Sequence, residues 1–459
     1  MLLTFVVSII IGILTMILRY SLWRKEYSQL MPGRRPRFFD ILGDLKELAI
    51  YDNSPNKYFW QTNFFNVIRR RTQEFGKLQL FCLWITFFPF VCIVKKGAVK
   101  VSELMEKKII EKNFTYKWME PVLGTGLLTS EVSKWKPRRK LLMPCFHSDI
   151  LRGFVPVFNE YSQKFVEFLQ KETKKEFTYI ETPVTLLTLD IICETMFGVK
   201  TGDSENDIPQ FVKSFRRVNE LFAVRMFQVW LWPNCLFKLS KDGKETMHHV
   251  KVVHDFTRNG HETVSISIVW ALYLIGLYKD VQTKIHEELD KVIGKDTTRE
   301  VLEKDLNDLE YLDCVLKEAS RLYPAAPWFG RKFPKDTPSN ICGHVIPKGT
   351  ACVVLTYFLH RDEEVFLDPE KFDPGRFSAE NCHKIPEYAY IPFAAGPRNC
   401  IGQRFAMMEI KIIMSSILRN FSIESLDTRD IVKPFLYVTL HPSVPVRIRI
   451  RPRMFQKQH

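Results

Sequence analysis

One cysteine in a glycine-containing loop is the residue of this chain best suited to chemistry. Cys400 lies in the sequence FAAGPRNCIG, residues 393–402, directly before an amphipathic stretch that predicts a helix over residues 401–421. A thiolate is a ligand for a soft metal, and we expect backbone N–H groups and the positive end of the following helix to lower the pKa of this thiol. The alternative is a buried free cysteine without a ligand.

The neighbours of Cys400 suit a flat, anionic cofactor. We expect Gly396 and Gly402 to adopt positive φ or to let the backbone approach a planar group closely. Phe393 can screen the sulfur from water, and Arg398 can pair with an anionic edge of the cofactor.

A glutamate and two further arginines could support the same site. Glu318 and Arg321 are three residues apart in a helix predicted over residues 306–322, so they share one face and can form an ion pair. Arg376, in the sequence FDPGRF, could give the same carboxylate a second guanidinium. Exposed helices also carry such ion pairs, and the pair alone then has only a solubilising role.

Trp135 and Arg139 form a second pair, four residues apart in the sequence WKPRRK. An indole N–H and a guanidinium on one helix face could both donate to one carboxylate of a ligand. Arg331, which follows the sequence PWFG, is a further candidate for this contact. The alternative is a basic surface helix.

An acid and a hydroxyl lie next to each other before a strongly apolar helix predicted over residues 264–278. Gly260, Glu262 and Thr263 could seat dioxygen and pass protons to it, although the same residues could simply cap the helix. A zinc site of the His-Glu-x-x-His type is unlikely at His261, because the fifth position is Ser265.

The composition predicts one large, helix-rich domain over residues 37–459. Hydrophobic residues make up 46% of the 459 residues and include 36 Phe, enough for a sizeable core. The ten cysteines contain no Cys-x-x-Cys pair, which argues against a disulfide framework and favours a reducing compartment.

The net charge of +14 favours an anionic membrane surface or an acidic protein partner. We expect no nucleic-acid partner, because no helix-turn-helix, zinc-finger or RNA-binding motif accompanies the charge.

The N-terminus predicts a membrane anchor. Residues 1–18 contain no charge and are followed by Arg19, Arg24 and Lys25, which suits one transmembrane helix with its basic flank in the cytoplasm. A basic, proline-containing hinge is expected over residues 19–36. A cleaved signal peptide is the alternative, but the start of this chain has neither the basic residues nor the clear cleavage site of such a peptide.

The fold class is mostly α with small β-sheets. Residues 78–95 predict a strand pair with a turn at Pro89, and residues 341–359 predict a second strand-and-turn block. Apolar residues at helical spacing predict helices over residues 281–293, 306–322 and 401–421. No phosphate-binding loop is found, so any NADPH is expected to be bound by another protein.

The loop around Cys400 resembles the haem-binding loop of the cytochrome P450 family, and the other motifs occur in that family's order along nearly the whole chain. The resemblance is greatest to the microsomal fatty-acid-hydroxylase branch, family four, particularly its insect members. It implies the cytochrome P450 fold, with haem b bound by Cys400 as the metal ligand. The cofactor-binding residues it implies are Trp135, Arg139, Arg331, Phe393, Gly396, Arg398 and Gly402.

The resemblance also implies roles for the remaining motifs and for partners. Glu262 and Thr263 would be the distal acid and alcohol, while Glu318, Arg321 and Arg376 would form a structural lock that holds the cysteine loop. Such proteins insert one oxygen atom into apolar substrates. They receive electrons from NADPH–cytochrome P450 reductase, with cytochrome b5 as a further partner, on the cytoplasmic face of the endoplasmic reticulum membrane.

The chain departs from the family at three places. Gly375 replaces a common glutamate, and Asn259 replaces a glutamate that in some relatives forms an ester with the haem. Gly260 follows Asn259 directly, whereas relatives continue for several tens of residues through the first half of the distal helix. This junction motivates an alternative: an inactive or haem-binding-only product of such a gene. An isomerase or dehydratase acting on an oxygenated lipid is a third possibility, disfavoured because Glu262 and Thr263 remain.

Overall fold

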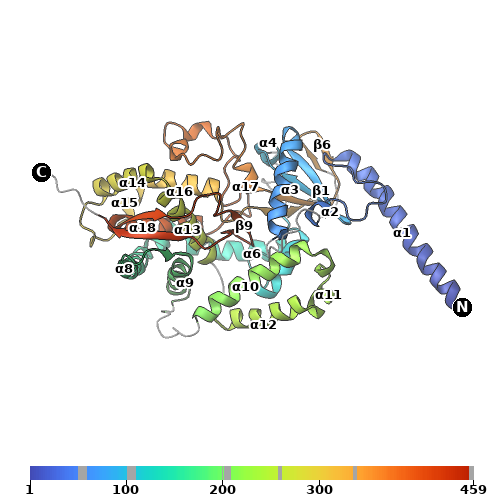
Figure 1. The fold of residues 1–459 in the computed structure, drawn as a ribbon, viewed down its shortest axis with the longest axis horizontal. Helices are drawn as coiled ribbons and strands as arrows, with labels where there is room; N and C mark the ends of the chain where they lie inside the picture. The colour runs from blue at the N-terminus through green and yellow to red at the C-terminus, as the bar shows by residue number, and fades with distance from the viewer. Residues whose placement is uncertain are drawn as a thin grey trace. The chain divides into compact units, whose positions relative to one another are not determined.

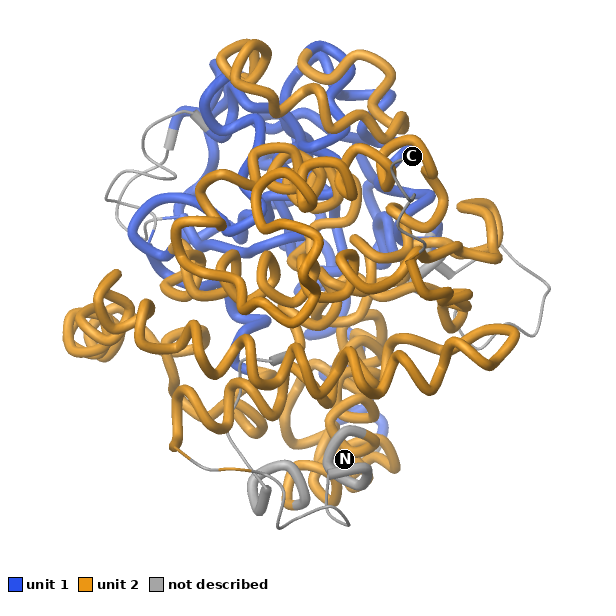
Figure 2. The backbone as a smooth tube through the Cα atoms, turned by 90° about the vertical axis from the view of Figure 1, so that its left-hand side faces the viewer, with its two compact units in different colours: residues 1–117, 328–364, 386–398 blue, residues 118–327, 365–385, 399–459 orange. Residues whose placement is uncertain are grey.

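The computed structural model describes residues 1–49, 59–100, 110–198, 200, 208–256, 261–333 and 339–453. These residues form two compact units, shown in different colours in Figure 2. The first contains residues 1–117, 328–364 and 386–398, and the second contains residues 118–327, 365–385 and 399–459. The sequence predicted one domain over residues 37–459, and the chain passes repeatedly between the two units. The fold class is as predicted, mostly helical with small sheets (Figure 1).

A four-stranded sheet forms the centre of the first unit. Strands β1 (Leu80–Ile85) and β2 (Phe88–Ile93) form a hairpin, β7 (Ala351–Val354) runs parallel to β2, and β4 (Phe329–Lys332) completes the order β1-β2-β7-β4. The first strand block expected from the sequence therefore shares one sheet with β7 of the second block. A separate hairpin pairs β5 (Ser339–Ile341) with β6 (His344–Ile346).

The turn of the first hairpin was predicted at the wrong residue. It lies at Thr86 and Phe87, and Thr86 has a positive φ of 51°. Pro89 instead lies within β2, opposite Trp84. Proline is tolerated there because β2 pairs with β7 only from Phe90 onward, so Pro89 has one neighbouring strand.

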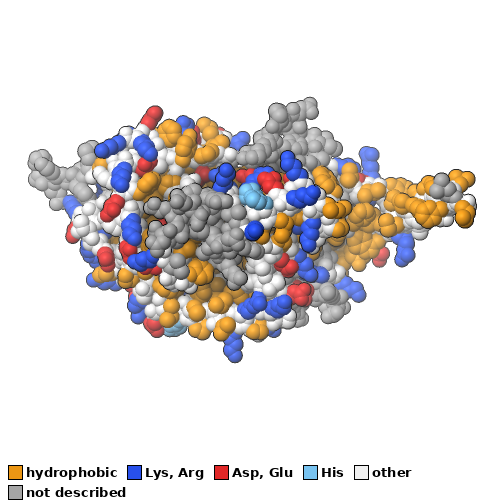
Figure 3. Space-filling model, turned by 90° about the horizontal axis from the view of Figure 1, so that it is seen from below, with side chains coloured by type: hydrophobic (Ala, Val, Ile, Leu, Met, Phe, Trp, Pro, Cys, Tyr) orange, Lys and Arg blue, Asp and Glu red, His pale blue; other side chains and the backbone are white. Residues whose placement is uncertain are grey.

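The N-terminal helix α1 (Leu2–Leu30) is longer than the predicted anchor. Its apolar residues give a stretch with a mean hydropathy of 2.1 that is long enough to cross a membrane. Hydrophobic side chains cover its surface, at the right of Figure 3. Residues 19–30, expected in the hinge, are helical.

The second half of α1 packs on the sheet of the first unit. Trp23 lies edge-on to Trp84, with ring centroids 5.5 Å apart, and Tyr20 donates a hydrogen bond to the carbonyl of Thr86. Arg24 is 2% exposed and donates to the carbonyls of Arg37, Phe38 and Asp40. Arg24 is therefore a buried structural residue. It ties residues 37–40 to α1, and Tyr20 and Trp23 hold α1 against the sheet.

The other helices of the first unit are α2 (Leu45–Ala49), α3 (Phe59–Phe75), α4 (Lys96–Lys100) and α17 (Thr356–Leu359). The second unit contains the long helices α8 (Val155–Glu172), α9 (Glu181–Phe197), α10 (Ile208–Phe227), α12 (Lys241–Phe256), α13 (His261–Leu277), α14 (Lys279–Val292), α16 (Glu310–Leu322) and α18 (Gln403–Asn420). Its short helices are α5 (Glu120–Leu123), α6 (Val132–Leu142), α7 (Ser148–Arg152), α11 (Asn234–Leu239) and α15 (Glu303–Asp308).

Helix α13 is the buried centre of the second unit. It is apolar all round, as expected for a helix with no solvent face, and Trp270 on it donates to the carbonyl of Leu440. It packs on a three-stranded sheet of order β3 (Thr178–Tyr179), β11 (Arg447–Pro452), β8 (Phe421–Ser425). Gly276 permits this approach, because a Cβ there would lie 2.4 Å from the hydroxyl of Ser425. A hairpin of β9 (Pro434–Leu436) and β10 (Leu440–Pro442) lies in the same unit.

The helix predicted over residues 306–322 is two helices. α15 ends at Asp308 and α16 begins at Glu310. The break is stabilised from another helix, because the Glu288 carboxylate of α14 accepts the N–H groups of Tyr311 at 2.6 Å and Leu312 at 2.9 Å. These are two of the N–H groups that the start of a helix leaves without an internal partner.

Candidate active site

The cysteine loop begins in the first unit and ends in the second, with the division between Arg398 and Asn399. Gly396 has a φ of +71°, which confirms the expected positive value. Gly402, which caps the start of α18, has a φ of −89°, so only the close approach to a planar group is left as its expected role. A Cβ on Gly402 would only touch the Phe146 ring at 3.7 Å, an ordinary contact. Phe393 is half-buried in the first unit.

The pKa of the Cys400 thiol differs from the sequence expectation. The side chain has an exposed face, but the protein atoms crowded around the thiol desolvate it, and this raises its pKa. A hydrogen bond from the Gly402 N–H and the charge of Arg139 oppose this effect without overcoming it. The prediction of a lowered pKa is therefore wrong, because desolvation exceeds the favourable dipoles. A bound metal would deprotonate the thiol outright.

Arg139 connects helix α6 to the cysteine loop. Its guanidinium donates to the backbone carbonyl of Asn399 at 2.9 Å and to the Asn399 side-chain oxygen at 2.8 Å. Trp135, one helical turn earlier, is 5% exposed. The sequence singled out Trp135 and Arg139 but not Asn399, whose amide has no recognisable motif beyond its place beside Cys400.

Three cations gather in the first unit. Arg331 and Arg398 are 2% and 8% exposed, and Lys112 is half-buried. Burial lowers the pKa of Arg398 to about 10 and that of Lys112 well below its ordinary value, and in both cases the neighbouring charge of Arg331 adds to the effect. Burial also lowers the pKa of Arg331.

Within the described part of the chain, neither Lys112 nor Arg331 lies within ion-pair distance of a carboxylate. The polar contacts of Arg331 and Arg398 include the backbone carbonyls of Gly330 at 3.0 Å and Ile110 at 3.2 Å. Buried like charges are unfavourable unless an anion joins them, so this group is suited to a ligand with carboxylates. Lys112 was missed by the sequence analysis because it belongs to no motif.

Glu318, Arg321 and Arg376 come together as an ion-pair cluster in the second unit. The Glu318 carboxylate accepts from Arg321 at 2.7 and 2.8 Å and lies 3.5 Å from Nε of Arg376. Glu318 and Arg321 are both fully buried. The same carboxylate accepts the N–H of Asp373 at 2.9 Å, so it holds the segment that carries Arg376 to α16.

Glu262 and Thr263 occupy the first turn of α13. The Glu262 carboxylate accepts from the Asn219 side chain on α10 at 2.8 Å and lies 3.2 Å from Nε2 of His441 on β10. Thr263 is exposed. Asn219 and His441 are contacts that the sequence could not indicate, since both are far from Glu262 along the chain.

Two sequence alternatives concern this region. Among the described residues, no group of three His, Cys, Asp or Glu side chains could hold a metal ion. The side chain of His261, on which the zinc alternative depends, lies outside the described residues. The junction at Asn259 and Gly260 lies outside the described residues.

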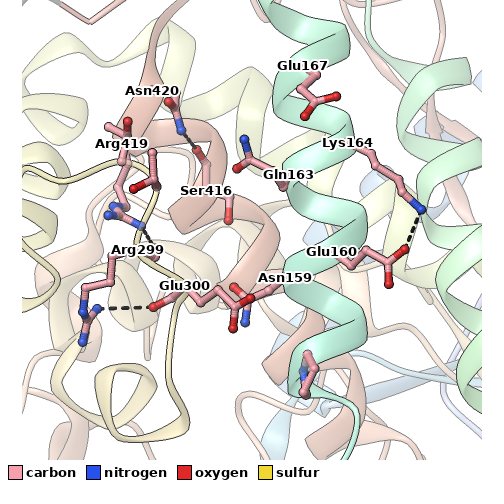
Figure 4. A pocket seen from close by; sticks show the side chains of 13 residues that line it. Asn159, Glu160, Gln163, Lys164, Glu167, Arg299, Glu300, Ser416, Arg419 and Asn420 are labelled. Carbon is pink, nitrogen blue, oxygen red and sulfur yellow. Dashed lines mark hydrogen bonds and ion pairs between the residues drawn. The ribbon is translucent and has the colours of Figure 1, made fainter.

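A separate pocket of about 660 Å³ lies between α8, the loop of residues 297–300 and α18 in the second unit (Figure 4). None of the residues that line it was predicted as a site residue. Its charged lining balances three carboxylates against three cations, so it selects neither an anion nor a cation, and we assign it no role. The charged residues are Glu160, Glu167, Glu300, Lys164, Arg299 and Arg419.

Known proteins match the chain over most of its length. A sequence model described as "Cytochrome P450" matches residues 48–259 and 248–446. Cytochrome P450 4V2 of Rattus norvegicus is 35% identical over 509 aligned residues, covering 97% of this chain and 94% of that protein. Cytochrome P450 4V2 of Homo sapiens is 35% identical, covering 85% of each, and cytochrome P450 4c3 of Drosophila melanogaster is 32% identical, covering 81% of each.

The family match consists of two segments that overlap at residues 248–259, directly before Gly260. This is the position at which the sequence predicts a missing block. The matches do not favour the alternative of an inactive gene product.

Proposed function

The chain belongs to the cytochrome P450 family of haem-thiolate monooxygenases, and we propose that it oxygenates an apolar substrate with electrons from NADPH–cytochrome P450 reductase. The proposed substrate is a fatty acid, a hormone or a xenobiotic. Bound haem supplies the activation of dioxygen, and the protein supplies binding, orientation and protons.

The observation that carries the proposal is the group of cations formed by the half-buried Lys112 and the buried Arg331 and Arg398. Haem b has two propionate carboxylates, and their charges would offset the burial and the repulsion by Arg331 that lower the pKa of Lys112 and of Arg398. The residues present therefore fit the cofactor. We assign all three to the propionates, with Lys112 as an addition to the residues predicted from the sequence.

We assign the iron ligand to Cys400 and its support to the second unit. Arg139 holds Asn399, the residue directly before Cys400, and its positive charge favours the thiolate over the thiol. The Gly402 N–H acts in the same direction. Trp135, Phe393, Gly396 and Gly402 would complete the surroundings of the cofactor, and the cluster of Glu318, Arg321 and Arg376 would keep the adjoining segments in place.

Glu262 and Thr263 are the proposed distal acid and alcohol. A carboxylate and a hydroxyl beside each other can hold a proton and transfer it to bound oxygen. The support for this role is their order along the chain relative to the other motifs and the position of both residues in the first turn of α13.

We place the protein in the endoplasmic reticulum membrane, anchored by α1, with its catalytic part on the cytoplasmic face and with cytochrome b5 as a further partner. The length and hydropathy of α1 support the anchor, and the exposed Arg19 and Lys25 after the uncharged residues support the orientation.

Reconstitution of the full chain with NADPH–cytochrome P450 reductase in phospholipid vesicles tests the proposal. We expect NADPH oxidation to depend on the reductase, and a panel containing dodecanoic acid, a steroid and an alkylated xenobiotic to yield at least one hydroxylated product. A protein that has the thiolate-type spectrum of the reduced carbon monoxide complex but oxidises no NADPH would be a haem binder without turnover, and the proposal would then be wrong.

A further inference from the structure

The Glu262 carboxylate is held by side chains from two other elements of the second unit. Oε1 of Glu262 accepts from Nδ2 of Asn219 at 2.8 Å and lies 3.2 Å from Nε2 of His441. Asn219 is 7% exposed, while Glu262 and His441 each keep a little under a fifth of their side-chain surface exposed. Helix α10, helix α13 and strand β10 thus meet at one carboxylate oxygen.

The chemistry of the imidazole decides whether this contact is favourable. Nε2 of His441 attracts the Glu262 carboxylate only when it carries a hydrogen, which holds for the charged imidazolium and for one of the two neutral tautomers. Thr439 lies within reach of the same nitrogen, with Oγ1 at 2.9 Å. In the other tautomer the hydroxyl can donate to Nε2, and the carboxylate then faces a lone pair.

Other ionisable groups lie near His441. The Tyr437 ring lies 5.1 Å from the imidazole, and the Tyr437 hydroxyl lies 3.4 Å from Glu220, which pairs with Arg217 at 2.8 Å. Glu181, from the start of α9, has a pKa that burial raises and that the charges of Arg216 and His441 lower. The surroundings of His441 thus contain carboxylates as well as arginines.

We propose that His441 and Asn219 are positioning residues for the distal acid, and that the Nε2–H of His441 fixes the orientation of the Glu262 carboxylate. This inference rests on the proposed function, which makes Glu262 the distal acid. Two donors from different elements restrict the carboxylate far more than one, because each removes rotational freedom about the side-chain torsions of Glu262. A proton donor held in one orientation delivers protons more efficiently than one that rotates.

Three variants of the full chain separate positioning from packing. His441→Phe keeps a ring against Tyr437 but has no donor, His441→Gln keeps an amide donor but cannot ionise, and Glu262→Gln removes the acid. His383→Phe, at an exposed histidine of the same unit, is the matched control. The measured quantity is the fraction of NADPH electrons released as hydrogen peroxide with reductase and dodecanoic acid across the neutral pH range.

We expect His441→Phe to release several-fold more peroxide than the wild type, and His441→Gln to remain near the wild type because its amide keeps a donor. The double variant of His441→Phe with Glu262→Gln should be no worse than Glu262→Gln alone. A purely packing role predicts the reverse order, with phenylalanine harmless and glutamine disruptive, and that result would overturn the inference.

A stability measurement tests the contact between Glu262 and His441 independently of turnover. In thermal unfolding of the full chain, we expect the losses from His441→Phe and Glu262→Gln to be clearly less than additive in the double variant. Additive losses would contradict the contact itself. Absence of the thiolate-type carbon monoxide spectrum or of reductase-dependent NADPH oxidation in the wild type would instead contradict the proposed function, and the unfolding cycle would still decide the inference.

Discussion

Arg139 donates two hydrogen bonds to Asn399, the residue immediately before Cys400, one to its carbonyl at 2.9 Å and one to its side-chain oxygen at 2.8 Å. A planar guanidinium can make two such bonds at once, which fixes both the position and the direction of the loop. The proposed iron ligand thus lies next to a residue clamped from helix α6.

Replacement of Arg139 by lysine should loosen this clamp. Lysine is a point donor that cannot reproduce the two parallel bonds, and loss of one charged hydrogen bond amounts to about 1.5–3 kcal/mol. We expect the purified protein to retain roughly tenfold less haem under dilution, measured as the haem-to-protein ratio over time. Arg138→Lys, at an exposed neighbour on the same helix, should change haem retention little. Equal retention in both variants would show that the Asn399 contact is unimportant.

Removal of the Glu318 charge should strongly destabilise the second unit. Glu318→Gln leaves the fully buried Arg321 without its carboxylate, which is expected to lower the free energy of unfolding by about 3–5 kcal/mol. This is a large part of the stability of an ordinary domain. The yield of folded protein and its denaturation midpoint measure the loss, with Glu310→Gln at an exposed site of α16 as the control. A midpoint like that of the wild type would contradict the structural role.

The charge of Lys112 should destabilise the haem-free chain and should strengthen the binding of haem. In the folded, haem-free chain the pKa of Lys112 is lowered. At pH values between this lowered pKa and the ordinary lysine pKa of about 10.4, the unfolded chain therefore binds more protons than the folded chain. The free energy of unfolding therefore rises with pH through this interval, and the penalty is complete below it. We expect Lys112→Met to stabilise the haem-free chain by about 1–3 kcal/mol at neutral pH and to flatten this rise.

With haem bound, the same substitution should weaken cofactor binding, because a propionate loses a charged partner. Denaturation of both forms and competition of haem for apomyoglobin provide the two measurements, and Lys77→Met at an exposed position of the first unit is the control. A destabilised haem-free Lys112→Met chain would show that the lysine has a favourable partner within the protein.

Truncation of α1 at two points should separate anchoring from folding. Deletion of residues 2–18 removes the uncharged stretch but keeps Tyr20, Trp23 and Arg24 against the sheet, so we expect a folded protein released from membranes by alkaline carbonate. Deletion of residues 2–30 also removes these contacts and should lower the free energy of unfolding by about 3 kcal/mol or more. Equal stability of the two forms would contradict the packing role of the second half of α1.

Local sequence patterns were sufficient where neighbouring residues determine the structure. The spacing of Glu318 and Arg321 on one helix face, the positive φ of Gly396 and the helix after Cys400 all depend on short stretches of chain, and each was predicted. The break at Leu309 was not, because the carboxylate that stabilises the start of α16 comes from Glu288 on another helix.

Tertiary contacts explain the remaining differences. Arg24 was interpreted as a membrane flank by its charge, but the carbonyls of residues 37, 38 and 40 bury it. The pKa of Cys400 was expected to fall because the helix start and N–H groups are visible in the sequence, whereas the atoms that desolvate the thiol are not. The proposed roles of Lys112 and His441 depend on contacts with residues far along the chain, which local patterns do not indicate.

The most direct measurement of the central assignment is the absorption spectrum of Cys400→Ala beside that of the wild type, each reduced and saturated with carbon monoxide. If Cys400 is the iron ligand, the wild type shows the red-shifted Soret band of a thiolate-bound haem, and the variant loses that band and most of its haem. Cys145→Ala, at an exposed cysteine of the same unit, should keep the band. An unchanged band in Cys400→Ala would contradict the account.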